Sequence, residues 1–179
     1  GVTPWGTVLT CEENYKEFYG ELDGPDSEDW QSRVTFDGGY DNGWRDQVHH
    51  HPWHYGWVVE ADPMTGSARK LVAMGRVSRE GTKVTVAKDG RAVVYSGDDH
   101  KGGCIFKFVS RHPNDLSEGQ LYAGDVKGGR WVELDWSSQP ALRTKFSDQL
   151  DVLLHARQAG LAAGATAMDR PEGIDIHPK

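Results

Sequence analysis

The sequence has few cysteines, no long apolar run and no cluster of basic residues. Cys11 and Cys104 are its only cysteines, and a chain of 179 residues can build a core without a disulfide, so cysteine usage says little about the compartment. No segment approaches the roughly 20 apolar residues that span a bilayer. Residues 1–4 lack the basic start and apolar core of a signal peptide. We therefore expect neither a membrane span nor a leader in this chain.

Basic residues are also outnumbered by acidic ones. Lys and Arg total 20 against 27 Asp and Glu, which gives a formal net charge of −7. Nucleic-acid binding requires a basic patch, and no Lys/Arg run is present, so we expect no nucleic-acid partner. An acidic surface does not attract an anionic substrate, so bound metal ions would have to supply local positive charge.

What the sequence does contain is a series of short strands separated by turn residues. Strands are predicted at residues 2–10, 55–61, 69–74, 83–88, 91–96, 103–110, 120–126 and 130–134. Asp89-Gly90 between two of them is a strong hairpin signal. Strands in up-and-down order fit an all-β sandwich or part of a β-propeller, with another strand starting near Ile174 and Ile176.

Two segments interrupt this pattern. Residues 15–54 are rich in Gly, Asp, Ser, Trp and His without periodicity, which predicts a long loop insertion. Its His-rich run at 49–54 is interpreted either as a metal site or as a solvated loop with an accidental cluster. Apolar spacing predicts one helix over residues 146–163, with Ser147 or Asp148 capping its start and Gly164 ending it. Residues 1–179 are therefore predicted to be part of one domain that continues beyond both ends.

A thiol and two carboxylates follow the first strand, at Cys11, Glu12 and Glu13. Thiolate and carboxylate are soft and hard metal ligands, although a buried structural cysteine beside two solvated glutamates also explains the pattern. More carboxylates follow other strand or helix ends, at Glu80, Asp98, Asp99, Asp169 and Glu172. Each has an ordinary explanation as a turn, an ion pair or a helix exit, but in a propeller the corresponding strand ends converge near the axis.

Such a carboxylate cluster would need cations, because like charges repel. Calcium and iron suit oxygen ligands, and a thiolate adds a soft ligand for iron. Arg170 would present a planar fork of donors to a phosphate. Metal ions together with an arginine are the usual equipment of phosphoryl transfer.

Five segments together resemble the PhoX-type alkaline phosphatase family, in the family's order. They are TPWGTVLTCEEN at 3–14, YGWVVEADP at 55–63, GRVSRE at 75–80, GDD at 97–99 with KFVS at 107–110, and ATAMDRPE at 165–172. The combination is specific, whereas any one motif alone is weak. The resemblance covers nearly all of this chain but only the middle of a family member.

The resemblance implies an all-β, six-bladed β-propeller, of which this chain is a part carrying one helical insertion. It also implies an exported enzyme, periplasmic or extracellular, that hydrolyses phosphomonoesters at a centre of ferric iron (Fe3+) and calcium (Ca2+) ions joined by an oxo group. In that family the motif cysteine bridges the irons, and this cysteine is Cys11 here. The metal ligands would further include Glu12, Glu80 and Glu172, and Arg170 would contact the phosphate in catalysis. We expect a monomer.

The match has departures. Arg79 stands where the family commonly has His, many relatives have Ala in place of the motif cysteine, and later carboxylate ligands would lie beyond Lys179. We therefore expect the chain alone to be inactive. Two alternatives stay open: a non-catalytic calcium-binding propeller, and a hydrolase of phosphodiesters, polyphosphate or phytate.

Overall fold

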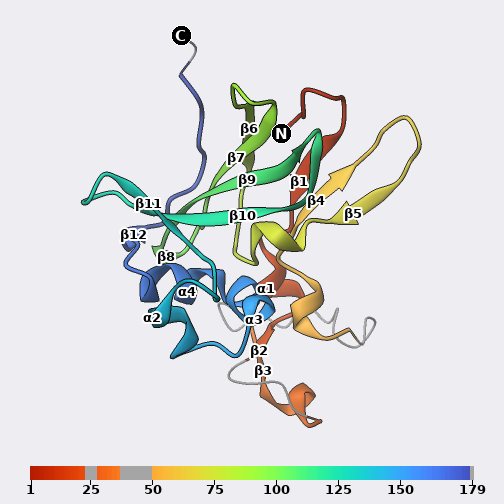
Figure 1. The fold of residues 1–179 in the computed structure, drawn as a ribbon. Coiled ribbons are helices and arrows are strands. Elements are labelled where there is room, and N and C mark those ends of the chain that lie inside the picture. The colour runs from red at the N-terminus through yellow and green to blue at the C-terminus, as the bar shows by residue number, and fades with distance from the viewer. Residues whose placement is uncertain (23–27, 37–49, 178–179) are drawn as a thin grey trace.

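The computed structural model describes residues 1–22, 28–36 and 50–177. These form a mostly β structure, as predicted, with several short helices. The largest sheet has five antiparallel strands in the order β11-β10-β9-β7-β6. Along the chain these strands are β6 (Thr82–Val86), β7 (Arg91–Gly97), β9 (Ile105–Pro113), β10 (Asp115–Asp125) and β11 (Arg130–Glu133). Figure 1 shows them stacked as one layer above the helices.

The predicted β6–β7 hairpin is confirmed. Gly90 takes a φ of +85° in the turn, and the Arg91 amide donates to the Asp89 carboxylate at 3.1 Å. A type of turn that needs positive φ favours glycine, which is why the Asp-Gly pair was informative.

A second sheet holds the start of the chain. It has the order β1-β4-β5, with β1 (Val8–Cys11), β4 (Val58–Ala61) and β5 (Ala68–Lys70). The first strand is shorter than the predicted 2–10, because Gly6 at φ +96° and hydrogen bonds between Thr3 and Thr7 turn residues 3–7 back on themselves. The strand predicted at 69–74 likewise ends at Lys70 and is followed by the 3-10 helix η5 (Val72–Met74).

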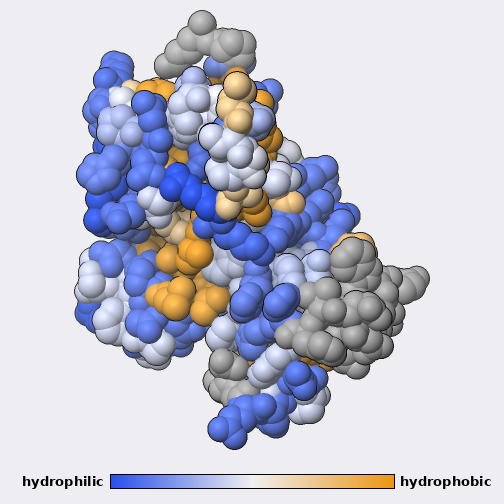
Figure 2. Space-filling view, turned by 90° about the vertical axis from the view of Figure 1, so that its right-hand side faces the viewer, coloured by the Kyte–Doolittle hydropathy of each residue, from blue (hydrophilic) through white to orange (hydrophobic). Residues whose placement is uncertain are grey.

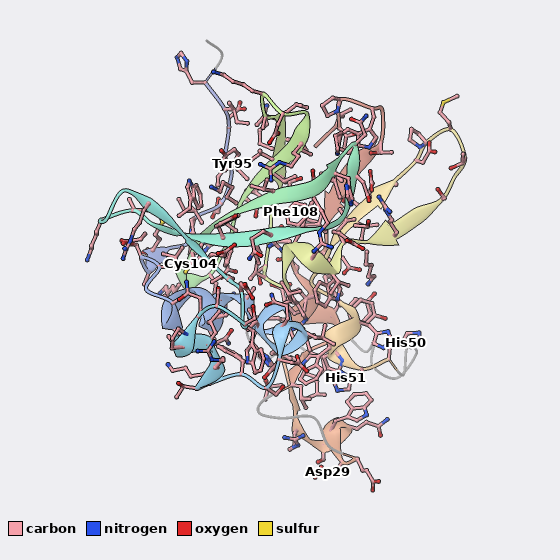
Figure 3. The ribbon with its side chains drawn as sticks, in the orientation of Figure 1. Asp29, His50, His51, Tyr95, Cys104 and Phe108 are labelled. Atoms are coloured by element: carbon pink, nitrogen blue, oxygen red, sulfur yellow. The ribbon has the colours of Figure 1, made fainter. Side chains whose placement is uncertain are left out.

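The predicted loop insertion at 15–54 contains short elements where the structure describes it. They are α1 (Tyr15–Phe18), β2 (Glu21–Leu22), η1 (Trp30–Arg33), β3 (Val34–Thr35) and η4 (Pro52–His54), and β2 pairs with β3. In the His-rich run, the rings of His50 and His54 stack at 5.5 Å, and His49 lies outside the described residues. Figure 3 shows His50 and His51 well away from Phe108 in the large sheet.

The prediction of one continuous helix over residues 146–163 was wrong. The chain forms α3 (Gln149–Leu154) and α4 (Ala156–Ala162), preceded by α2 (Pro140–Arg143). His155 breaks the run at φ −114° and ψ 42°, where its ring bonds the Asp151 carboxylate at 2.8 Å. The predicted cap is present, because the Asp148 carboxylate accepts from the Asp151 amide. Gly164 follows α4 at φ +99°.

The core lies between the large sheet and these helices. Phe106, Phe108 and Leu121 of the sheet join Val152 and Ala156 of the helices in one buried cluster. Figure 2 shows that one outer face is mostly hydrophilic, with hydrophobic side chains gathered in a strip at mid-height. No helix in the described ranges is long and apolar enough to cross a membrane.

One more strand pair positions the site. β12 (Met168–Asp169) pairs with β8 (Lys101–Gly103), which brings residues after the helices back to the loop that follows β7. No strand includes Ile174 or Ile176 in the part of the chain that the structure describes, so the strand predicted there is not formed.

Candidate active site

Cys11 is the last residue of β1 and is half-buried against the core. Burial raises the pKa of its thiol, and the nearby Arg79 guanidinium opposes that rise. Both cysteines are free thiols, and Cys104 lies under α4, so no disulfide competes for Cys11.

Arg79, the departure from the family motif, is 2% exposed. Its guanidinium donates to the carbonyl oxygens of Gly75, at 2.6 Å, and Met74, and to the Ser96 hydroxyl at 2.9 Å. Burial lowers the pKa of Arg79, and the facing Cys11 counteracts that shift. These bonds hold the long cation inside the core, so it places a fixed positive charge behind the thiol without occupying the site.

Glu13, two residues after Cys11, is within electrostatic range of three other carboxylates. Burial raises the pKa of Glu13, and the charges of Glu80, Asp99 and Glu172 raise it further. Asp99 lies close enough to Glu13 for the two carboxyl groups to influence each other's pKa. Glu80 and Glu172 are exposed, so the cluster opens to solvent. The charge of Glu13 also raises the pKa of the Cys11 thiol, which links the thiol to the cluster.

Glu12 is held differently from the other predicted ligands. One carboxylate oxygen accepts from the backbone amides of Gly56 and Trp57, each at 3.0 Å. Its other oxygen accepts from the Lys70 ammonium at 2.7 Å. Both oxygens therefore fasten the end of β1 to the neighbouring chain, and the structure brings Glu13 rather than Glu12 toward Glu80 and Glu172.

Arg170 forms a bidentate ion pair with Asp99 through two hydrogen bonds. Its Nε and Nη2 atoms each lie 2.8 Å from an Asp99 oxygen, and Nη2 is 3.3 Å from Glu172. The guanidinium holds the pKa of the Asp99 carboxyl below its usual range. Arg170 and Asp99 line a small polar cavity of about 150 Å³ together with Glu13, Asn14, Lys16, Glu17 and Ser78. Asp99 binds the Arg170 guanidinium through Nε and Nη2, and the remaining Nη1 group can donate to an oxyanion.

Gly97 allows this segment to approach the end of β7. A Cβ atom placed on Gly97 would lie 2.0 Å from the Pro171 carbonyl oxygen and 2.5 Å from that of Glu172. We expect Gly97→Ala to push residues 170–172 outward, and to lower both the melting temperature and any activity that needs Arg170. Gly102→Ala is a poor control because of its positive φ, whereas Gly81→Ala meets nothing within 4 Å at ordinary φ and should be tolerated. Equal behaviour of the two variants in thermal melting would contradict the close approach.

The thiol and the carboxylates of this region meet some of the requirements of a metal centre. Across residues 1–22, 28–36 and 50–177, no three His, Cys, Asp or Glu side chains converge closely enough to hold a metal ion. In charge the set does suit cations, because the negative charges of Glu80, Asp99 and Glu172 act on Glu13 and raise its pKa. The described residues thus provide suitable ligands, one thiol and several carboxylates, but not a closed site.

Comparison with known proteins agrees with this chemistry. The family model described as alkaline phosphatase PhoX matches residues 1–179. A solved structure of Pseudomonas fluorescens PhoX in complex with vanadate, a transition state analogue, is 33% identical with a TM-score of 0.74. The match covers 97% of this chain and 36% of that one, so this chain spans about a third of the relative's length.

The search of curated proteins gives no match. The structural likeness confirms the predicted fold class, a mostly β chain that matches part of a PhoX structure. With a family match over its whole length, the chain belongs to the PhoX alkaline phosphatase family.

Proposed function

We propose that the full-length protein hydrolyses phosphomonoesters and that this chain supplies its phosphate-binding arginine and part of its metal site. The observation that carries the proposal is the Arg170–Asp99 pair set among Glu13 and Glu172, beside a free thiol. The family match and the vanadate complex of the related PhoX support it, because vanadate imitates a phosphoryl group in transfer.

Iron and calcium ions are the proposed cofactors. Cys11, Glu80 and Glu172 would hold them, with Glu13 in place of Glu12, since the Glu12 oxygens are engaged by two amides and Lys70. When bound, the ions would polarise the phosphoryl group and neutralise the negative charge of the carboxylates. Further ligands would come from other parts of the full-length protein, so we expect the present chain alone to be inactive.

Arg170 and Asp99 would act as a unit on the substrate. Asp99 fixes the guanidinium through Nε and Nη2, and no described residue bonds Nη1, which leaves that group to donate to a phosphate oxygen. An arginine fixed in advance loses little conformational freedom on binding, and its charge stabilises the oxyanion that develops in the reaction. The family resemblance also supports action in the periplasm or outside the cell.

Metal removal tests the proposal on the full-length protein. We expect chelation to abolish hydrolysis of phosphomonoesters, and Cys11→Ala to reduce both bound iron and turnover, because the soft ligand is lost. Cys104→Ala is the matched control, since this second free thiol is buried in the core away from the carboxylates. Elemental analysis and steady-state assays are the measurements.

Other outcomes favour other functions. Activity that is indifferent both to chelation and to Cys11→Ala would remove the metal mechanism. Calcium-dependent melting without iron and without turnover would indicate a non-catalytic calcium-binding propeller. Faster hydrolysis of diesters or of phytate than of monoesters would indicate one of the related hydrolases.

A further inference from the structure

A second and larger cavity lies on the other side of α1 from the phosphate-binding site. Its volume is about 720 Å³, within the range of small-molecule sites. It is bounded by α1 and β2 on one side, by Trp53 of η4 at another, and by α3 and α4. This cavity is separate from the one that Arg170 and Asp99 line.

The two cavities are back to back. Lys16 lines both of them. Val77 lines the large cavity, and the next residue, Ser78, lines the small one. Asp99 lines the small cavity, and its neighbour Asp98 is paired with Arg157, which lines the large one. Consecutive residues therefore face the two spaces, and Lys16 borders both of them.

Two basic groups of the large cavity, Arg76 and Arg157, are neutralised by ion pairs. Arg76 donates to both oxygens of Glu21, at 2.8 and 2.9 Å. Arg157 pairs with the buried Asp98 through two hydrogen bonds, one of them 2.7 Å long. The other charged residues of the wall are Lys16, Lys145, Asp148 and Asp151, two of each sign. The wall therefore carries little net charge, so this cavity is not a second anion site.

Aromatic and aliphatic side chains make up much of the remaining wall. Tyr15, Trp53, Phe146 and Leu154 all line it. The Trp53 ring meets the His155 ring edge-on at 5.6 Å, which fixes its orientation. The Trp53 indole N–H is buried and has no acceptor among the described residues. A buried donor without a partner costs free energy, and a ligand with a suitable acceptor would recover it.

We propose that the large cavity binds the organic group of the phosphomonoester, and that this group is an aromatic ring system. The phosphate would lie at Arg170 while the ring packs against Trp53 and Phe146, with Lys16 between the two parts. Aromatic faces and a charge-balanced wall suit a flat, weakly polar group better than a sugar or a short polar chain. This inference rests on the proposed function and specifies the substrate class of the same site.

The test compares the effect of each variant on an aromatic phosphomonoester with its effect on a small aliphatic one, each relative to the parent protein on the same substrate. In the full-length protein we expect Trp53→Ala to lower kcat/KM for 2-naphthyl phosphate about tenfold, mainly through KM, because ring packing is lost. Hydrolysis of methyl phosphate should change by less than about twofold. Leu150→Ser provides a second variant that perturbs folding less, since Leu150 lines the cavity but is 54% exposed. Leu161→Ser is its matched control, an exposed helical leucine that does not line the cavity.

Equilibrium binding keeps this test separate from the proposed function. The dissociation constants of 2-naphthylmethyl phosphonate and methyl phosphonate are measured by calorimetry for the same variants. A preference for the naphthyl ligand that is lost in Trp53→Ala and reduced in Leu150→Ser supports the inference, even if no phosphomonoester is hydrolysed. Equal losses for both ligands, or no preference in the parent protein, would overturn it while leaving any observed phosphatase activity intact.

Discussion

Replacing Arg170 with alanine is expected to lower kcat/KM for phosphomonoesters by about 10²–10³-fold, the usual effect of removing one preorganised donor to a developing oxyanion. The side chain is fixed by Asp99 through two bonds of 2.8 Å and is 56% exposed, so it is both oriented and accessible. Arg170→Lys should restore little, because an ammonium cannot bond Asp99 and a phosphate oxygen with the same planar geometry.

The control is another exposed arginine paired with an aspartate. Arg130 bonds Asp125 at 3.0 Å at the turn between β10 and β11, and its side chain is 71% exposed. Arg130→Ala should leave kcat/KM within about twofold of the parent, and neither variant should shift the melting temperature much, since exposed ion pairs add little stability. Full activity in Arg170→Ala would remove this residue from the site.

Replacing Arg157 with methionine is expected to cost about 3–5 kcal/mol of unfolding free energy, as is typical when one partner of a buried ion pair is removed. The Asp98 side chain is 0% exposed and Arg157 is 13% exposed. The variant would leave a carboxylate buried without its partner, directly behind Asp99. Denaturant unfolding of the full-length protein is the measurement.

A double variant identifies the cause of that loss. Asp98→Asn combined with Arg157→Met removes the buried charge as well, so it should be less destabilised than Arg157→Met alone. Arg111→Met is the matched control, because Arg111 pairs with Glu118 at the surface, with both side chains more than half exposed. A loss in Arg157→Met no larger than that in Arg111→Met would show that the buried pair is dispensable.

Local signals in the sequence predicted the large sheet well. Asp89-Gly90 gave the β6–β7 hairpin, and alternation in β9 gave the buried Phe106 and Phe108. Prediction failed where side chains redirected the backbone. Thr3 and Thr7 bond each other and fold back the first segment, and His155 interrupts the predicted helix. Neither bond is visible in a hydrophobic pattern, since each depends on which polar partner comes within reach.

The metal ligands named from the sequence stay predictions. The family resemblance named Glu12 among them, yet the Glu12 oxygens fasten the strand end, whereas Glu13 is within electrostatic range of the other carboxylates. A signal was present, because Cys11 and Glu13 are two residues apart and an extended chain places such residues on the same side. The sequence does not indicate that Asp98 faces the core while Asp99 faces the site. This difference depends on Arg157 of α4, which pairs with Asp98 only once the helices have packed against the sheet.

The pair between Asp99 and Arg170 joins positions 71 residues apart, with β9, β10 and β11 of the large sheet and the helices α2, α3 and α4 in between. During synthesis on the ribosome, the carboxylates of the first hundred residues therefore emerge and fold before their guanidinium partner exists. At that stage Glu13, Glu80 and Asp99 are present, whereas Arg170 and Glu172 are not. The ion pair between Asp99 and Arg170 is thus completed late in the synthesis of this part of the chain.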